Sequence, residues 1–261
     1  MSELPRSRSA ADPWLGATPP HLPTPQCPLP TNVLLPGDPA RVDVTLTLLD
    51  QPRLTGQRRE FRLGTGHWRG VPVAVCSTGI GGPSTEIALV ELARLGARSV
   101  VRVGGMGAWT PDLPVGAIGV VSEANRSGGA ARWYSGQDTP AVPDSALQGA
   151  LEDAARLSGR PVRRVRVESV DSYYLGQGRP VPGHEEAATR RTAEVLFAQV
   201  DGLDMESETV LAVGRALGLR SAALLGVHGN RVTDEWLEDY EPLQHDVVVA
   251  ALDAVTGVQG T

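Results

Sequence analysis

Two arginines stand close to glycines in a way that suits the binding of an oxyanion. Arg102 lies inside the apolar run VVRVGGMGAW, residues 100–109, and Arg41 follows Gly37 in the segment GDPAR. An arginine within an apolar strand is costly unless an anion pairs with it, and its guanidinium fork suits bidentate contact with an oxyanion. A structural ion pair with an aspartate or glutamate is the alternative for Arg102. Two such arginines beside glycines favour an oxyanion site.

The glycine clusters do not fit a dinucleotide-binding loop. That fingerprint requires Gly-x-Gly-x-x-Gly at the start of a helix, whereas GIGGPS has another spacing and GGMGAWTPDLPVG runs into prolines. All 24 basic residues are arginines, which excludes a P-loop lysine and a Schiff-base lysine. We expect residues 104–107 to form a glycine turn that ends the strand and lets the backbone approach a ligand.

Strands and helices alternate along the chain, and the segments that hold these residues belong to that pattern. Apolar strands are expected over residues 32–36, 71–76, 116–124, 162–174 and 220–231, and in the segment that begins at Ser99. Helices are expected from Pro39 and over residues 84–95, 145–158, 207–219 and 243–255. This alternation predicts an α/β fold, a three-layer α/β/α sandwich with a mixed, largely parallel central sheet. The glycine turns at 37, 79–82 and 104–107 would then lie at one edge, where such sheets bind ligands.

Composition narrows the class of protein further. The first 30 or so residues are rich in proline, so we expect a disordered extension over residues 1–20 and one domain over residues 21–261. A net charge of −6 argues against a nucleic-acid binder. No apolar run approaches the length of a membrane span, and the chain does not begin like a signal peptide. Cys27 and Cys76 form no metal or disulfide pattern, which favours the cytoplasm.

An ordered set of motifs resembles the trimeric-or-hexameric nucleoside phosphorylase family. PGDPAR, RREF, CSTGIGGPS, DSYYLGQGR, DMES and GNR occur in the family's order and at similar spacing between His21 and Val255. The GQxR pattern is specific to the uridine branch. The resemblance implies phosphorolysis of uridine, with deoxyuridine as a further candidate, to uracil and ribose 1-phosphate. Inorganic phosphate would be the co-substrate, and no cofactor would be required.

Three alternatives remain open at this point. The same fold also serves purine nucleoside phosphorylases and nucleoside hydrolases, and a third possibility is a nucleoside-binding protein of low activity. Purine enzymes of the family place an aspartate late in the chain, and Asp234 is the one nearby candidate, although its surroundings, NRVTDEW, match poorly.

The resemblance assigns the phosphate to residues from two subunits. Within one chain these are Gly37, Arg41, Arg102 and Gly105, and Arg59 would reach the same phosphate from a neighbouring subunit. A solvated surface arginine is the alternative for Arg59, and we expect its neighbour Arg58 to be one.

The ribose and the base would meet the second half of the chain. Glu206 would accept hydrogen bonds from the ribose hydroxyls, as suits a carboxylate beside a vicinal diol, although an acidic residue is also common at a helix start. Met205 would pack on the sugar, and His21 of a neighbouring subunit would contact the 5′-hydroxyl. The expected base-binding residues are Gly107, Tyr173, Gln177, Arg179, His228 and Arg231. A glutamine offers one donor and one acceptor to the uracil edge, whereas Tyr173 has a half-buried core aromatic as its alternative.

The family also holds a structural potassium ion between subunits. Glu60, Ile80 and Ser84 match its ligands. Because Arg59 and His21 would act across an interface, we expect at least a dimer, and the resemblance implies a hexamer built as a trimer of dimers.

The chain departs from the family pattern at the glycine cluster. The family has Gly-Thr-Thr-Gly where this chain has Gly104, Gly105, Met106 and Gly107, so the first threonine hydroxyl is missing. A hydrogen bond to a charged group contributes roughly 1.5–3 kcal/mol, which predicts weaker binding of phosphate or ribose, or an altered sugar preference. His228 replaces an apolar residue expected near the uracil 5-position, Asp204 replaces a glutamate, and Tyr173 replaces a phenylalanine.

Overall fold

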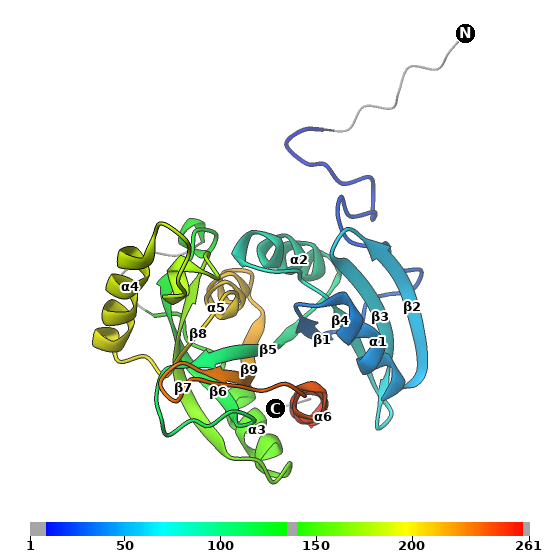
Figure 1. The fold of residues 1–261 in the computed structure, drawn as a ribbon. Coiled ribbons are helices and arrows are strands. Elements are labelled where there is room, and N and C mark those ends of the chain that lie inside the picture. The colour runs from blue at the N-terminus through cyan, green and yellow to red at the C-terminus, as the bar shows by residue number, and fades with distance from the viewer. Residues whose placement is uncertain (1–8, 135–139, 258–261) are drawn as a thin grey trace.

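The computed structural model describes residues 9–134 and 140–257, which have an α/β fold (Figure 1). The strands are β1 Asn32–Pro36, β2 Asp50–Arg58, β3 Phe61–Trp68, β4 Val71–Cys76, β5 Ser99–Ala108, β6 Ile118–Ser127, β7 Val162–Val170, β8 Gly202–Asp204, β9 Arg220–Asn230 and β10 Glu235–Trp236. The α-helices are α1 Pro39–Thr47, α2 Gly82–Leu95, α3 Ser145–Arg156, α4 Glu185–Ala198, α5 Ser207–Ala216 and α6 Glu241–Gly257. Two short 3₁₀ turns, Ala131–Trp133 and Leu175–Gln177, complete the set in the described part of the chain.

The strands form one mixed sheet in the order β10-β9-β6-β7-β8-β5-β1-β4-β3-β2. Its centre is parallel, since β1 pairs with β4 and β5, and β5 pairs with β9, all in parallel. The β5–β9 pairing also closes β5, β8, β7, β6 and β9 into a ring. The expected mixed α/β fold is therefore confirmed.

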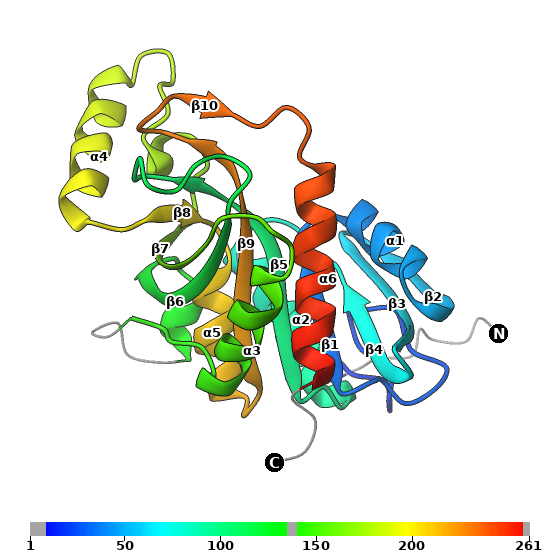
Figure 2. The same cartoon turned by 90° about the horizontal axis from the view of Figure 1, so that it is seen from below.

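Helices cover both faces of the sheet, as the two largest apolar clusters show. Leu34 of β1 packs in one cluster with residues of α1, α3 and α6, whereas its neighbours Val33 and Leu35 pack with α2 and α5. Figures 1 and 2 show the same division, with α2 and α5 on one side of β5 and β9 and α6 on the other. Alternate residues of a strand point to opposite faces, so β1 contributes side chains to the apolar clusters on both faces of the sheet.

Local sequence signals explain where several helices start and stop. The Asp38 side chain accepts a hydrogen bond from the Ala40 amide at 2.8 Å, and Pro39 opens α1. Helix α2 ends at Gly96, whose φ of 114° suits glycine. The start of α1 fixes Arg41 on the first turn of the helix, directly after β1.

Residues 104–107 do not form the expected turn. They continue β5, and Gly104, Gly105, Met106 and Gly107 all pair with β9. The glycines are needed for another reason, because the Arg102 guanidinium would lie only 2.7 Å from a Cβ at position 104. The prediction of a turn was wrong: Gly104 and Gly105 make room for the side chains of Arg102 and His228 above an extended strand.

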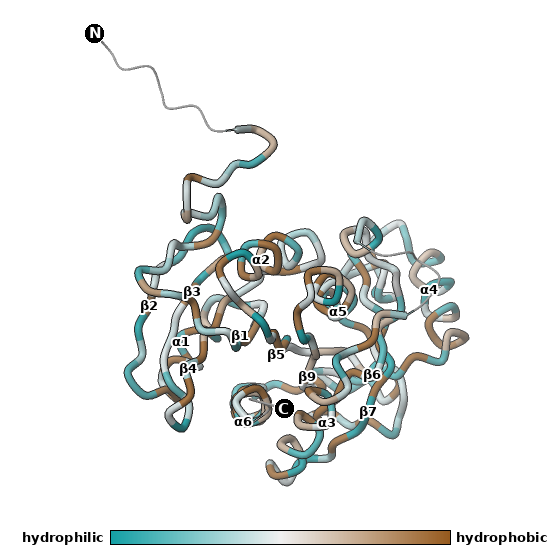
Figure 3. The backbone as a smooth tube through the Cα atoms, turned by 180° about the vertical axis from the view of Figure 1, so that it is seen from behind, coloured by the Kyte–Doolittle hydropathy of each residue, from teal (hydrophilic) through white to brown (hydrophobic). Residues whose placement is uncertain are grey.

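Some elements carried no clear sequence signal. Strands β2 and β3 form an antiparallel hairpin that the alternation of strands and helices did not indicate, and β2 is exposed along most of its length. Figure 3 shows the hydrophilic colour of β2 at the edge of the sheet. Helix α4 and the short strands β8 and β10 were also missed, and β7 ends at Val170, four residues before the expected end.

The N-terminal arm lies against β2 and α2. The buried Glu91 carboxylate accepts hydrogen bonds from the His21 and Leu22 amides and lies 2.6 Å from His21 Nδ1. Arg58 donates to the carbonyl oxygens of Pro19, Pro20 and Leu22. Arg58 is exposed, as expected of a surface arginine, and its guanidinium also holds the arm.

Residues 9–20 form no helix, and the boundary expected near residue 20 stays a prediction. Among the helices in the described part of the chain, none is long and apolar enough to span a membrane.

Candidate active site

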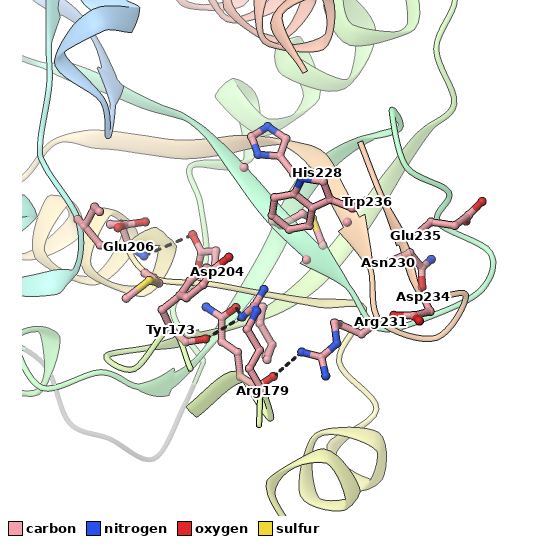
Figure 4. A pocket seen from close by; sticks show the side chains of 18 of the residues that line it. Tyr173, Arg179, Asp204, Glu206, His228, Asn230, Arg231, Asp234, Glu235 and Trp236 are labelled. Atoms are coloured by element: carbon pink, nitrogen blue, oxygen red, sulfur yellow. Dashed lines mark hydrogen bonds between the residues drawn. The ribbon is translucent and has the colours of Figure 1, made fainter. Parts of the chain in front are cut away.

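Two adjoining cavities open where β1, β5 and β9 meet the start of α5. Their volumes are about 610 and 600 Å³, and both are lined by Arg41, Ile80, Arg102, Gly105 and Glu206. Gly37, Glu60, Gly79 and Ser84 line the smaller cavity alone. The residues expected at the base line the larger cavity, namely Gly107, Tyr173, Gln177, Arg179, His228 and Arg231, together with Met205. Figure 4 shows Asp204 and Glu206 on one side of the larger cavity and Arg231, Asp234 and Glu235 on the other.

Arg102 is buried between two carboxylates. Its Nε donates to Asp204 Oδ2 at 2.9 Å, and its Nη2 lies 2.6 Å from Glu206 Oε2. Burial alone would lower the Arg102 pKa, but Glu206 and Asp204 outweigh it and raise the pKa above its ordinary value. The structural ion pair considered as the alternative for Arg102 is thus present. The guanidinium has five N–H donors, so donors remain for a ligand.

The charge of Arg41 is compensated only in part. Its guanidinium forms no ion pair or hydrogen bond with any described residue, and the Tyr240 ring lies 6.0 Å away. Burial, followed by the nearby charge of Arg102, lowers the Arg41 pKa. Asp38, Tyr240 and Glu206 offset this lowering of the pKa only in part. A largely buried cation without an anionic partner is unfavourable, and this one lines both cavities. The arrangement is that of a site prepared for an anion.

The two carboxylates on Arg102 differ in their other contacts. Asp204 Oδ2 also accepts from the Ser207 amide at 2.9 Å and its hydroxyl at 2.6 Å, so Asp204 fixes the start of α5. Glu206 Oε1 accepts from the Gly81 amide at 2.6 Å. Burial raises the Glu206 pKa, and Arg102 opposes this shift. Glu206 therefore joins the loop before α2 to the arginine while facing both cavities.

A second group of polar residues fills the opposite end of the larger cavity. Arg179 Nη1 donates to the Tyr173 carbonyl at 2.7 Å and to the Gln177 side-chain oxygen, and its guanidinium lies 4.0 Å above the Tyr173 ring. Arg231 donates to the carbonyls of Gln177 and Gly178, each at 3.2 Å. Two arginines thus hold Gln177: its carbonyl oxygen accepts from Arg231, and its side-chain oxygen accepts from Arg179.

Two expected ligand residues lie apart from the cavities in this single chain. His21 is bound to Glu91, and the exposed Arg59 has a positive φ of 54° at the β2–β3 turn. Neither lines either cavity. Both were expected to act on a neighbouring subunit, and that expectation stays a prediction.

The three expected potassium ligands lie together at the smaller cavity. Glu60, Ile80 and Ser84 all line it, and the Ser84 hydroxyl donates to the Ile80 carbonyl at 3.3 Å. Oxygen donors of this kind suit a hard cation. Within the described residues, no group of three or more His, Cys, Asp or Glu side chains is placed to hold a metal. One chain therefore offers a carboxylate, a carbonyl and a hydroxyl, two of which are already hydrogen-bonded to each other.

Several residues of the site gave no signal in the sequence. Trp236 lines the larger cavity from the short strand β10, and Tyr240 lies with its ring centre 5.2 Å from that of His228. Gln244 of α6 donates to the Gly104 carbonyl at 3.3 Å. These residues lie far from Arg102 in the chain, and only the fold brings them together.

The chain belongs to the phosphorylase superfamily, whose family model matches residues 31–256. Among its relatives, the uridine phosphorylase of Thermococcus kodakarensis is 41% identical over 206 residues, covering 78% of this chain and 74% of the relative. The uridine phosphorylase of Escherichia coli is 38% identical over 208 residues, covering 78% and 82%. The guanosine phosphorylase of Halorubrum lacusprofundi is 33% identical over 213 residues, covering 82% and 84%. The expected family is therefore confirmed.

Proposed function

We propose that this protein is a uridine phosphorylase, a pentosyltransferase that converts uridine and phosphate into uracil and ribose 1-phosphate. The observation that carries the proposal is the unpaired guanidinium of Arg41 beside Arg102, at the junction of two cavities. The chain's likeness to several uridine phosphorylases supports the same substrate.

The geometry suggests how the reaction proceeds. Phosphate binds at the shared wall of the cavities, with Arg41, Arg102, Gly37 and Gly105 around it. A phosphate oxygen forms a bond to the anomeric carbon of ribose while the bond from that carbon to the uracil nitrogen breaks, and the electron pair leaves with uracil. Charge separation of this kind is stabilised by fixed cations and hydrogen bonds, so the residues present suffice without a covalent intermediate.

Glu206 and Met205 are placed to hold the ribose between the phosphate and the base. Glu206 keeps lone pairs beyond those used by Gly81 and Arg102, and these can accept from the ribose hydroxyls. Arg102 keeps N–H donors beyond those used by Asp204 and Glu206, so phosphate can bind there while Glu206 stays beside the sugar.

Gln177 and Arg179 are placed to bind uracil. Gln177 is buried and offers a donor and an acceptor to the base edge. Arg179 provides a cation for the negative charge that develops on uracil as it leaves. Tyr173, Gly107 and Arg231 line the same end of the cavity, with Arg231 holding the loop that carries Gln177.

The test is the dependence of uracil release on phosphate. Uridine is incubated with the protein at increasing phosphate concentration, and the loss of ultraviolet absorbance gives the initial rate. We expect a saturable dependence with no release in the absence of phosphate. Release that does not need phosphate would identify a hydrolase instead, and binding of uridine without release would identify a nucleoside-binding protein.

A purine substrate is the second candidate. Asp234 lines the larger cavity beside Arg231, and one relative is a guanosine phosphorylase. A higher kcat/KM for guanosine or inosine than for uridine would favour this alternative.

We also propose an assembly in which sites are shared between subunits. Arg59 and His21 would complete the phosphate and ribose sites of a neighbour, in a hexamer built as a trimer of dimers, and potassium would bind through Glu60, Ile80 and Ser84 between subunits. The free cysteines, Cys27 and Cys76, are compatible with the cytoplasm as the compartment. The mass of the assembly in solution, measured by light scattering, tests the oligomer.

A further inference from the structure

Two of the departures from the family pattern, Gly105 and His228, meet in the folded chain. A Cβ atom at position 105 would lie 2.6 Å from both Cε1 and Nδ1 of His228. Both residues belong to neighbouring parallel strands, since β5 pairs with β9 along this stretch. The imidazole therefore fills the space that a side chain at position 105 would take. The sequence suggested a missing contact at Gly105, but the structure puts a polar ring there.

Gln244 determines which nitrogen of this ring carries the proton. The Gln244 amide nitrogen donates to the Gly104 carbonyl at 3.3 Å and lies 2.5 Å from His228 Nε2. A backbone carbonyl only accepts, so the amide must present its NH₂ group here. His228 Nε2 is then the acceptor of the second N–H, and the proton of a neutral imidazole resides on Nδ1.

The charges around the ring keep it neutral. Burial, followed by the positive charges of Arg41 from α1 and Arg102 from β5, lowers the His228 pKa to about 4. Tyr240 packs against the ring from the segment before α6, and Gln244 is the uncharged neighbour from α6 itself. Asp204 and Glu206 are occupied by Arg102.

The Nδ1 atom makes no hydrogen bond within the part of the chain that the structure describes, and His228 lines the larger cavity together with Arg41, Arg102 and Gly105. A neutral imidazole with a fixed tautomer is a donor of one defined hydrogen bond. This donor lies above Gly105 of β5, where the strand has no side chain. Gly105 lines both cavities together with Arg41 and Arg102.

We propose that the Nδ1–H of His228, oriented by Gln244, donates a hydrogen bond to the bound phosphate in place of a side chain at position 105. This inference rests on the proposed function, because it takes phosphate to be the anion at Arg41 and Arg102. No proton is transferred: His228 stays neutral and acts by positioning and by donating. Gly105 and His228 form a matched pair, because the imidazole ring occupies the space that any side chain at position 105 would need.

A cycle of three variants tests the pair. His228→Val removes the donor, Gly105→Thr forces a side chain against the ring, and the double variant Gly105→Thr/His228→Val exchanges ring for hydroxyl. We expect His228→Val to raise the KM for phosphate by about tenfold or more, while the KM for uridine changes less than about threefold. The double variant should recover most of this loss, and Gly105→Thr alone should be worse than the double variant.

His245→Val is the matched control, since His245 lies on α6 next to Gln244 but is half exposed and outside both cavities. Its KM for phosphate should equal that of the wild type. Thermal unfolding of every variant separates loss of folding from loss of binding. An unchanged KM for phosphate in a folded His228→Val variant would overturn the inference, as would a rise in the KM for uridine alone, which would assign His228 to the base.

Phosphate binding without turnover distinguishes this inference from the proposed function. Titration of the wild type and of His228→Val with inorganic phosphate in a calorimeter needs no nucleoside. Weaker binding by the variant supports the role of His228 even if uridine is not the substrate. Equal affinity in the two proteins rejects it even if uridine is cleaved.

Discussion

At the scale of single residues, the site is built from charges that the fold does not neutralise equally. Arg102 sits between Asp204 and Glu206, whereas Arg41 forms no ion pair in the described chain, and the charges of Asp38 and Glu206 offset its burial only in part. A largely buried cation without an ion pair lowers the free energy of unfolding. Binding an anion there recovers that cost, which favours the ligand over water.

Replacing Arg41 should separate stability from function. In Arg41→Met we expect the free energy of unfolding to stay the same or rise by up to about 1 kcal/mol, because a desolvated, unpaired cation is removed. The kcat/KM for phosphate should fall at least about a hundredfold, since two charge-assisted hydrogen bonds are lost. Urea unfolding and steady-state kinetics measure the two effects.

The control for this variant is Arg156→Met, which removes an exposed arginine of α3 from its ion pair with Glu152. Its phosphate kinetics should match those of the wild type. A marked destabilisation of Arg41→Met would contradict the view that Arg41 is a largely buried cation without an ion pair.

His228 should make the stability of the wild type depend on pH. Its pKa is lowered from 6.5 to about 4 in the folded state, so the unfolded chain binds a proton as pH falls below 6.5 while the folded chain does not. Stability present above pH 6.5 is therefore lost as pH falls toward 4. Between pH 7 and pH 4.5 this group should cost about 2–3 kcal/mol.

The measurement is urea unfolding at both values of pH for the wild type and for His228→Val, since the difference cancels the effect of the carboxylates. The stability of the variant should fall less between pH 7 and pH 4.5. Equal losses in the two proteins would mean that His228 is not held neutral in the fold.

At the scale of elements, the N-terminal arm and α2 depend on one buried carboxylate. Glu91 of α2 is 3% exposed and accepts from two amides of the arm. In Glu91→Ala those amides lose their partner, so we expect a loss of about 2 kcal/mol or more in the free energy of unfolding. Amide hydrogen exchange at His21 and Leu22 should become faster.

Arg94→Ala provides the comparison on the same helix. It removes the exposed ion pair with Asp12 and the contact with Trp14, and exposed pairs contribute at most about 1 kcal/mol. Slow exchange at Leu22 in Glu91→Ala would show that the arm is held by its apolar contacts instead.

Much of the fold followed from sequence patterns, because strands such as β1 and β4 contain apolar runs and helices such as α2 have clear ends. The hairpin β2–β3 did not, since an exposed edge strand needs no apolar alternation. The continuation of β5 through its glycines was also missed, because glycines after a strand resemble a turn until the side chains above them are known.

The candidate site was predictable in part, because several of its residues lie in short sequence motifs. Arg41, Arg102, Gln177 and Glu206 lie in recognisable motifs, and the fold brings them to two adjoining cavities. Other contacts join residues from separate elements. Arg102 pairs with Asp204, and Gln244 contacts His228. Pairings of that kind depend on the packing of the sheet, which no local pattern contains.

At the scale of the whole molecule, the proposed sharing of sites between subunits can be tested by mixing inactive chains. Arg41→Met damages a site from its own chain, and Arg59→Met would damage the site of the neighbour. In a mixed dimer, one site carries both changes and the other carries neither. After exchange of subunits at equal concentration, we expect up to about a quarter of wild-type activity to return, because random pairing makes half of the dimers mixed.

A mixture of Arg41→Met with Arg102→Met is the control, since both residues would serve their own chain. Each site in that mixture retains one damaged arginine, so activity should not return. Recovery in the control, or its absence in the first mixture, would contradict the proposed role of Arg59.

The balance of phosphate against uracil tests the central proposal most directly. Phosphorus NMR follows inorganic phosphate and sugar phosphate while absorbance follows uracil in the same sample of uridine and protein. We predict that one phosphate is consumed and one ribose 1-phosphate appears for each uracil released. Release of uracil with free ribose and unchanged phosphate would contradict the assignment of Arg41 and Arg102 to a phosphate that attacks the sugar.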